Sequence, residues 1–253
     1  MYDSAPLRAP EIRVRLYILS VTIVILLCIS AAAQRPAKRF NAVTPNQVGA
    51  PDSHLKPIFE NHRVRAMRVE LGPQESTRSD PHRYDYLLIS FGDSTFQLVG
   101  HNSIDVQLAD GGMQLVPGRW PHKLVNTSSA PATLLMIELK DGAMAATAKC
   151  GLDKSPCKGS RFGRDLLGTY TQSTLFETEA VRLVRTELGP GGSVGEHTHA
   201  YDHVVIALTS LHLKLGSNEM TQPASSVAWQ SGGIDGIWNI DKQEQRFLLL
   251  ELK

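Results

Sequence analysis

The sequence has little of several features that identify common protein classes. Its formal net charge is only +1 at pH 7, and acidic and basic residues are interspersed, so no basic face suggests nucleic-acid binding. It has no phosphate-cradling loop, dinucleotide fingerprint or Ser-His-Asp elbow, so these classes of chemistry lack sequence support. No segment after residue 54 keeps an apolar period of 3.6 residues, which argues against a helical fold.

The first 33 residues do not resemble a folded domain. Three arginines precede an almost wholly apolar run at 16–30, and Ala31-Ala32-Ala33 follows it. This is the layout of a secretory signal peptide with a small-residue cleavage site. We therefore expect an exported protein, periplasmic or secreted. The alternative is a retained membrane anchor formed by residues 16–33, because the run is only just long enough to span a bilayer.

Cysteine is scarce, with three residues in the whole chain. Cys28 lies in the apolar N-terminal run, so a mature exported chain would keep only Cys150 and Cys157. Their spacing excludes a CxxC redox motif. In an oxidising compartment the pair predicts a disulfide that closes a short loop and contributes about 2 kcal/mol. The alternative is two free thiols in a flexible linker.

An internal repeat dominates the remaining sequence. Residues 59–73 (FENHRVRAMRVELGP) and 176–190 (FETEAVRLVRTELGP) match at nine of fifteen positions. The offset of 117 residues also aligns His82 with His199. Near the end, 134–140 (LLMIELK) aligns with 247–253 (FLLLELK) at an offset of 113. The chain is therefore predicted to repeat one structural unit, with four residues lost from the second copy.

Each copy has the pattern of short strands joined by turns. Residues 204–208 (VVIAL) form an apolar run of strand length, and apolar and polar residues alternate over 211–215 (LHLKL). Turn sequences such as Leu-Gly-Pro and Ala-Asp-Gly-Gly separate such runs. Many short strands at close spacing predict an all-β sandwich or closed barrel.

The repeat also predicts the domain organisation. The expected segments are a signal peptide or anchor (1–33), an N-terminal arm (34–54), a first barrel (55–141), a linker with both cysteines (142–170) and a second barrel (171–253).

Three histidines lie within seven residues of the second copy: His197, His199 and His203. On a strand, a spacing of two places His197 and His199 on the same face. Neutral imidazole binds Zn²⁺, Fe²⁺, Mn²⁺ and Ni²⁺. His203 follows a turn-like stretch that could return its ring to the same point, so the cluster predicts a metal site.

The spacing Gly191-x5-His197-x-His199-x3-His203 resembles the first motif of the cupin family, G-x5-H-x-H-x3,4-E-x6-G. His203 stands where the family has a glutamate, and Ser210 stands at the place of the last glycine.

The second cupin motif, G-x5-P-x-G-x2-H-x3-N, is similar to a stretch of the first copy. That stretch reads Gly111-x5-Pro117-x-Arg119-x2-His122-x3-Asn126, with Arg119 in place of the middle glycine. The resemblance covers nearly the whole chain after the N-terminal segment. It implies two tandem cupin-type jelly-roll β-barrels, a bicupin.

The resemblance implies a ligand set for each copy. In the second copy it is His197, His199, His203 and Asp235, where Asp235 depends on aligning 234–239 (IDGIWN) with 121–126 (PHKLVN). The implied cofactor is a divalent metal ion: Fe, Mn, Zn or Ni.

The first copy offers a weaker set, Asp80, His82, Tyr86 and His122. Tyrosine is a poor ligand for most divalent ions, and buried histidines with structural partners are an equally good interpretation of His82 and His122.

Other paired or aromatic residues have a functional and a structural interpretation. Tyr84-Asp85 and Tyr201-Asp202 recur in both copies, and a turn in which the aspartate accepts backbone N–H bonds is favoured over a pocket phenol. The three tryptophans are expected to pack in the barrels, the alternative being a pocket lining. They are Trp120, Trp229 and Trp238.

Three functions remain open. Cupins resembling this chain include dioxygenases of small phenolic or thiol compounds and sugar isomerases, so a metal-dependent enzyme acting on a small molecule is the first. The second is a non-catalytic module whose barrel binds a small ligand without metal. The third is a structural role in which the first copy stabilises the second or mediates a homodimer. No nucleic-acid partner is expected, and no membrane contact beyond the N-terminal segment.

Overall fold

The computed structural model of the protein describes residues 52–140, 148–151, 155–158, 161–164 and 169–253. The predicted signal peptide or anchor, most of the arm and much of the linker lie outside these residues. Within the described part all the regular elements are β-strands, and no helix there is long and apolar enough to cross a membrane.

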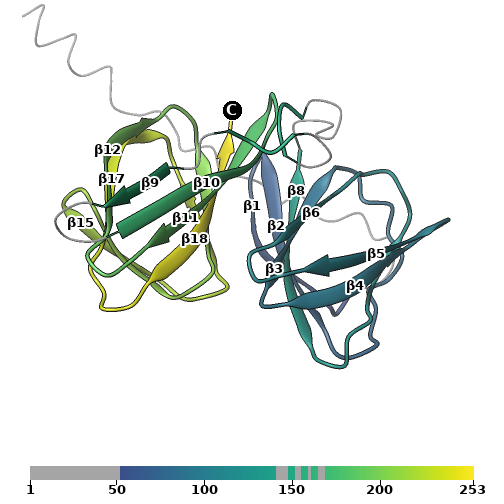
Figure 1. Ribbon diagram of the computed structural model, residues 1–253. Helices are drawn as coiled ribbons and strands as arrows, with labels where there is room; N and C mark the ends of the chain where they lie inside the picture. Colours follow the sequence, from purple (N-terminus) through teal and green to yellow (C-terminus); the bar gives the residue numbers. More distant parts are fainter. Residues whose placement is uncertain (1–51, 141–147, 152–154, 159–160, 165–168) are drawn as a thin grey trace, which may run out of the picture. The chain divides into compact units, whose positions relative to one another are not determined.

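The first barrel has eight strands, blue to teal in Figure 1. They form two antiparallel sheets in the orders β1-β2-β8-β3-β6 and β5-β4-β7. The strands are β1 (Leu55–Glu60), β2 (Val64–Leu71), β3 (Tyr86–Phe91), β4 (Ser94–Val99), β5 (Ser103–Leu108), β6 (Met113–Val116), β7 (Lys123–Asn126) and β8 (Ala132–Leu139).

The second barrel has ten strands, green to yellow in Figure 1, in the orders β16-β13-β18-β11-β10-β9 and β12-β17-β14-β15. The strands are β9 (Arg161–Arg164), β10 (Thr169–Glu177), β11 (Val181–Leu188), β12 (Ser193–His199), β13 (His203–Ala207), β14 (Leu211–Leu215), β15 (Asn218–Gln222), β16 (Val227–Gln230), β17 (Gly233–Asn239) and β18 (Gln245–Leu252).

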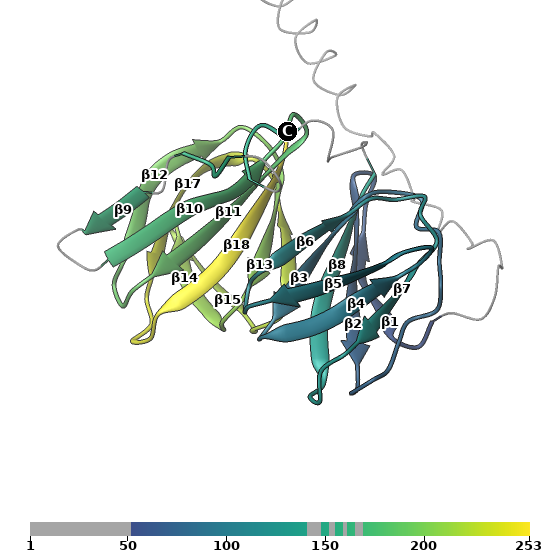
Figure 2. The same cartoon turned by 45° about the vertical axis from the view of Figure 1, so that its right-hand side comes forward.

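The two barrels repeat one strand order. The order β1-β2-β8-β3-β6 recurs as β10-β11-β18-β13-β16, and β5-β4-β7 recurs as β15-β14-β17. Figure 2 shows β10, β11 and β18 lying side by side. The prediction of an all-β fold with two tandem barrels is confirmed.

The second barrel adds a strand at one edge of each sheet. β12 pairs with β17, whereas the matching segment of the first barrel makes only the isolated bridges Ser76↔Val125 and Asp80↔His122. At the other edge, β9 pairs with the beginning of β10. Both β9 and the first residues of β10 lie in the segment expected to be a linker. The structure differs there because this pairing extends the sheet upstream of residue 171.

Two asparagines give structural support to the alignment of the copies. The Asn126 side chain donates to two carbonyl oxygens at the end of β2 and to a third in the turn before β8. The Asn239 side chain donates to two carbonyl oxygens at the end of β11 and to a third in the turn before β18. These bonds match one for one. The 113-residue offset that aligns the C-terminal parts of the barrels therefore also holds in β7 and β17.

The core has two interior clusters and a third that joins the barrels. Val184 and Leu249 belong to the interior of the second barrel, while their neighbours Leu183 and Leu250 belong to the joining cluster, which also contains residues of β2, β3 and β8. Strands buried on both faces read as continuous apolar runs. β8 and β18 are buried along nearly their whole length, which explains why their sequences are almost continuously apolar.

The structure forms a disulfide between Cys150 and Cys157, whose Cα atoms lie 4.9 Å apart. Cys150 also makes a bridge to Glu177 of β10. The short loop is thereby attached to the second barrel.

Candidate metal site and cavity

A bulge in β12 positions the first two histidines. β12 pairs Val194 with Ile237 and His197 with Asp235, so two residues of β12 face one residue of β17. Such bulges re-aim the side chains that follow them. His197 and His199 then share one face of the strand, and their ring centroids lie 4.5 Å apart.

The orientation of His199 is fixed by a buried carboxylate at the end of β18. Its Nδ1 donates to Glu251 Oε1 at 3.1 Å. The Glu251 carboxylate also accepts two bonds from Arg182 of β11, from Nε at 2.6 Å and from a terminal nitrogen at 2.9 Å. His199 and Glu251 are both buried. Because a carboxylate only accepts, His199 carries a proton on Nδ1, and in the neutral imidazole Nε2 is then the unprotonated nitrogen.

Charge partners keep Glu251 ionised in this buried place. Burial by itself raises the pKa of Glu251, but the hydrogen bonds from His199 and Arg182 outweigh that effect and lower the pKa to about 2. The carboxylate is therefore a permanent acceptor for the His199 Nδ1–H at neutral pH.

His197 has the same tautomer for a different reason. Its Nδ1 donates to the carbonyl oxygen of Gly195 at 2.9 Å, and a carbonyl can only accept. In the neutral form of either ring, Nε2 is therefore the unprotonated nitrogen. This is the state in which imidazole binds a metal ion.

The structure places His203 beside His199, but a hydrogen bond already engages its ring. Its ring centroid lies 4.6 Å from that of His199, and it is only 1% exposed. Its Nε2 is 3.0 Å from the side-chain oxygen of Gln230 on β16. His203 can bind a metal through Nε2 only if this hydrogen bond breaks.

The backbone of Asp235 lies directly opposite His197 in the β12–β17 ladder. The Asp235 side chain lies outside the described residues, so its predicted role as a ligand stays a prediction. Within the described part of the chain, no group of three or more His, Cys, Asp or Glu residues is arranged to hold a metal ion.

A cavity of about 460 Å³ adjoins the histidines. His197, His199 and Glu251 contribute to its wall, together with residues of β10 and β11. Most of the other lining side chains are polar or charged: Lys158, Tyr170, Gln172, Ser173, Thr174, Glu177, Arg182 and Glu196. The cavity suits a small polar molecule better than an apolar one.

The first barrel repeats the buried triad. His82 Nδ1 donates to Glu138 Oε1 at 3.1 Å, and two nitrogens of Arg65 donate to the same carboxylate at 2.8 Å. Burial raises the pKa of Glu138, but the bonds from His82 and Arg65 outweigh it and lower the pKa. Arg65, His82 and Glu138 stand at the positions of the second barrel's triad.

The rest of the first interior is closed by side-chain contacts. His122 donates from Nδ1 to the Trp120 carbonyl, and its Nε2 accepts a hydrogen bond from the Tyr86 hydroxyl. The Trp120 ring stacks on His122 with centroids 4.5 Å apart. Burial raises the pKa of Tyr86 and lowers that of His122. The nitrogen of His122 that would bind a metal is therefore occupied by a neutral phenol.

An aspartate and a histidine face each other in both barrels, but on opposite strands. Asp80 faces His122 in the first barrel, and His197 faces Asp235 in the second. Counting back from the matched asparagines, Gly233 takes the place of Trp120.

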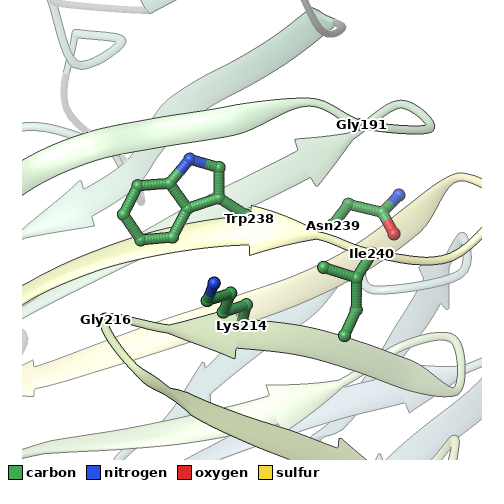
Figure 3. Close-up of a pocket in the computed structure, with 6 residues that line it drawn as sticks. All are labelled: Gly191, Lys214, Gly216, Trp238, Asn239 and Ile240. Atoms are coloured by element: carbon green, nitrogen blue, oxygen red, sulfur yellow. The ribbon is translucent and has the colours of Figure 1, made fainter.

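Asp85, Asp202 and Trp229 have structural roles, whereas Trp238 lines a hollow. Asp85 and Asp202 each accept a bond from a glycine N–H in a neighbouring loop, as the favoured interpretation predicts. Trp229 packs against Phe59 in the joining cluster. Trp238 lines a separate hollow of about 360 Å³ on the β14–β17 sheet, beside Lys214 and Ile240 (Figure 3).

The sequence analysis did not predict a functional role for the arginine and glutamate of either triad. All four were nevertheless among the repeat matches, since Arg65 aligns with Arg182 and Glu138 with Glu251. A charged residue repeated inside apolar strands was the signal that could have identified them.

Solved structures with a similar fold include a cupin 2 conserved barrel domain protein of Leptotrichia buccalis. It matches at 10% identity and a TM-score of 0.50 over 81% of this chain and 92% of that one. A variant of the oxalate decarboxylase of Bacillus subtilis matches at 10% identity and a TM-score of 0.55 over 82% of this chain and 78% of that one. AerE of Microcystis aeruginosa matches at 12% identity and a TM-score of 0.54 over 80% of this chain and 98% of that one.

The chain has the cupin fold. No protein-family sequence model matches it, and no curated protein sequence does either. The structural likeness is at low identity, so it establishes the fold alone, and the chemistry of this chain has to be argued from its own side chains.

Proposed function

We propose that the second barrel of this cupin holds one divalent metal ion and binds a small polar molecule beside it. His197 and His199 would hold the ion through Nε2, with Asp235 and a released His203 completing the set. The observation that supports this most is the pair of Nδ1–H bonds to Gly195 and Glu251, which makes Nε2 the ligating nitrogen on two rings 4.5 Å apart.

The donor set suits Fe, Mn, Zn or Ni, since three imidazoles and one carboxylate are compatible with each. When bound, such an ion supplies Lewis-acid polarisation of a substrate oxygen or, as iron, dioxygen activation. The protein's own part is to orient the imidazoles and to bind the polar groups of the ligand. Tyr170, Gln172 and Thr174 line the cavity, where their side chains would bind those polar groups.

The test is elemental analysis of protein purified without a histidine tag. We expect about one equivalent of metal per chain, lost in the double variant His197→Ala/His199→Ala. The matched control is His101→Ala/His212→Ala, which removes two histidines that belong to neither predicted ligand set. Metal that survives the first variant, or that disappears in the control, would contradict the proposal.

A non-catalytic, metal-free binding module is the second candidate. The bond between His203 Nε2 and Gln230 supports it, because that nitrogen is already used. Protein that contains no metal and keeps its melting temperature when Zn²⁺, Mn²⁺ or Ni²⁺ is added would favour this candidate.

We also propose that the protein is exported. The signal-like pattern of residues 1–33 and the Cys150–Cys157 disulfide support this. Expression of the full chain followed by intact-mass measurement of the extracytoplasmic fraction should give a product that begins near Gln34. A full-length product in the membrane fraction would favour the anchor.

A further inference from the structure

The same three side chains meet inside both barrels, in a place where charge is expensive to bury. Arg182, Glu251 and His199 do so in the second barrel. Taking a carboxylate out of water costs several kcal/mol, and a buried ion pair often stabilises a fold no better than apolar residues would. Fold stability alone is therefore a weak reason for the arrangement.

We propose that Glu251, held by Arg182, is a positioning residue that fixes His199 in its Nδ1–H tautomer and directs Nε2 to the metal site. This inference rests on the proposed function, because the tautomer matters only if Nε2 binds something. Ligating histidines commonly donate their other ring N–H to a carboxylate, which sets the ring's orientation and basicity.

Glu251 is not itself a ligand in this arrangement. Its Oε2 accepts from Arg182 Nε, and its Oε1 accepts from both Arg182 and His199. It lies at the Nδ1 side of the His199 ring, opposite the nitrogen that would bind the ion. The carboxylate that the cupin motif places at residue 203 has therefore not simply moved to residue 251.

Arg182 has a distinct part in the device. Its guanidinium engages both carboxylate oxygens, a planar geometry that a lysine cannot reproduce. The carboxylate is therefore held in one rotation, with Oε1 facing the imidazole. Without the two bonds from Arg182, Glu251 would stay charged but could rotate, so the tautomer of His199 would be less strictly fixed.

The first barrel supplies a matched control. Glu138 binds His82 and Arg65 in the same way, but there Tyr86 stands at the position of His203, and its hydroxyl binds His122 Nε2. A change at Glu138 disturbs an equivalent triad without touching the metal site of the second barrel.

The deciding experiment is long-range ¹H–¹⁵N NMR of histidine-labelled, metal-free protein. We expect His199 as the Nδ1–H tautomer in the native protein. In Glu251→Gln the amide can also donate to Nδ1, so the Nε2–H tautomer should become substantially populated. Glu138→Gln should leave the His199 signals unchanged. An unaltered His199 tautomer in Glu251→Gln would overturn the inference.

Zn²⁺ titration of the same proteins supplies the second readout. We expect Glu251→Gln to weaken Zn²⁺ binding about 10- to 100-fold, Arg182→Lys to weaken it less, and Glu138→Gln to leave it unchanged. Arg182→Lys keeps the charge, so it remains informative if Glu251→Gln unfolds. Equal affinity in the native protein, folded Glu251→Gln and Arg182→Lys would also overturn the inference. If the native protein binds no Zn²⁺, the proposed function fails, and the NMR result still decides whether Glu251 sets the tautomer.

Discussion

The two barrels share a scaffold and differ in how they use its interior. Both place an arginine, a glutamate and a histidine at matching positions. In the first barrel a tyrosine hydroxyl and a stacked tryptophan cover the remaining histidine. In the second, the histidines adjoin a cavity of about 460 Å³. The same triad therefore occurs in a closed interior and beside a cavity, and the two interiors differ in the few side chains around it.

The largest expected difference between the barrels concerns the arginines. Arg65→Met leaves Glu138, only 1% exposed, with His82 as its remaining side-chain partner, and should lower the free energy of unfolding by about 3 kcal/mol. Arg182→Met should cost only about 1–2 kcal/mol, because Glu251 lines the cavity and water can replace the lost bonds. Urea unfolding of both variants at one pH measures the two losses. Equal losses would show that the interiors are equally closed.

The next effect concerns the phenol that covers His122. Tyr86→Phe removes the hydroxyl that donates to His122 Nε2 and leaves a buried acceptor unsatisfied. We expect a loss of about 1–2 kcal/mol in the free energy of unfolding. The matched control is Tyr201→Phe, whose ring is 44% exposed and whose change should stay within about 0.5 kcal/mol. Equal losses of unfolding free energy in the two variants would show that the Tyr86 hydroxyl contributes no more to stability than an exposed one.

A smaller effect is the pH dependence that His122 gives to the first barrel. Burial lowers the pKa of His122 below its ordinary value of 6.5, so between the two values the unfolded chain binds more protons than the folded one. Stability should therefore fall as the pH drops below about 6.5, by at most about 1.4 kcal/mol per pH unit.

The measurement is the difference in free energy of unfolding between the native protein and His122→Gln, followed from pH 8 to pH 5. The variant should lack the His122 contribution, so the difference should change with pH in that window. A constant difference would mean that the folded His122 titrates normally.

The smallest expected stability change comes from placing at Gly233 the tryptophan that the first barrel has at residue 120. A Cβ added at Gly233 meets no atom within 4 Å, so Gly233→Trp should change the free energy of unfolding by less than about 0.5 kcal/mol. Because Gly233 pairs with His199, the indole would lie on the same face as that ring. It should weaken Zn²⁺ binding, whereas Gly233→Ala should not. Unchanged affinity in Gly233→Trp would show that Gly233 does not open the site.

Much of the fold could be predicted because the repeat and the strand pattern are local signals. Residues 204–208 are apolar throughout and form most of β13, and the alternation over 211–215 matches β14. The two-residue spacing of His197 and His199 likewise fixed their common face. The predicted ends of the barrels were less accurate at residue 171, because edge pairing between β9 and β10 has no strong sequence pattern.

The chemistry of the interior could be predicted only in part. The bonds of Arg182 and His199 to Glu251 join strands far apart in the sequence, and no spacing rule links those residues. The bond between His203 and Gln230 is of the same kind. It depends on two side chains meeting across β13 and β16, which only the three-dimensional arrangement reveals.

The repeated triad also indicates that the two halves have a common origin. An identical arginine, glutamate and histidine at equivalent places is most simply inherited from a single ancestral barrel that was later duplicated. The positions that differ between the copies are Asp80 and His197, His122 and Asp235, and Tyr86 and His203, and on this view each changed in one copy or the other after the duplication. The shared part of the interior is thus the triad that orients one imidazole, and the halves differ in what that imidazole faces.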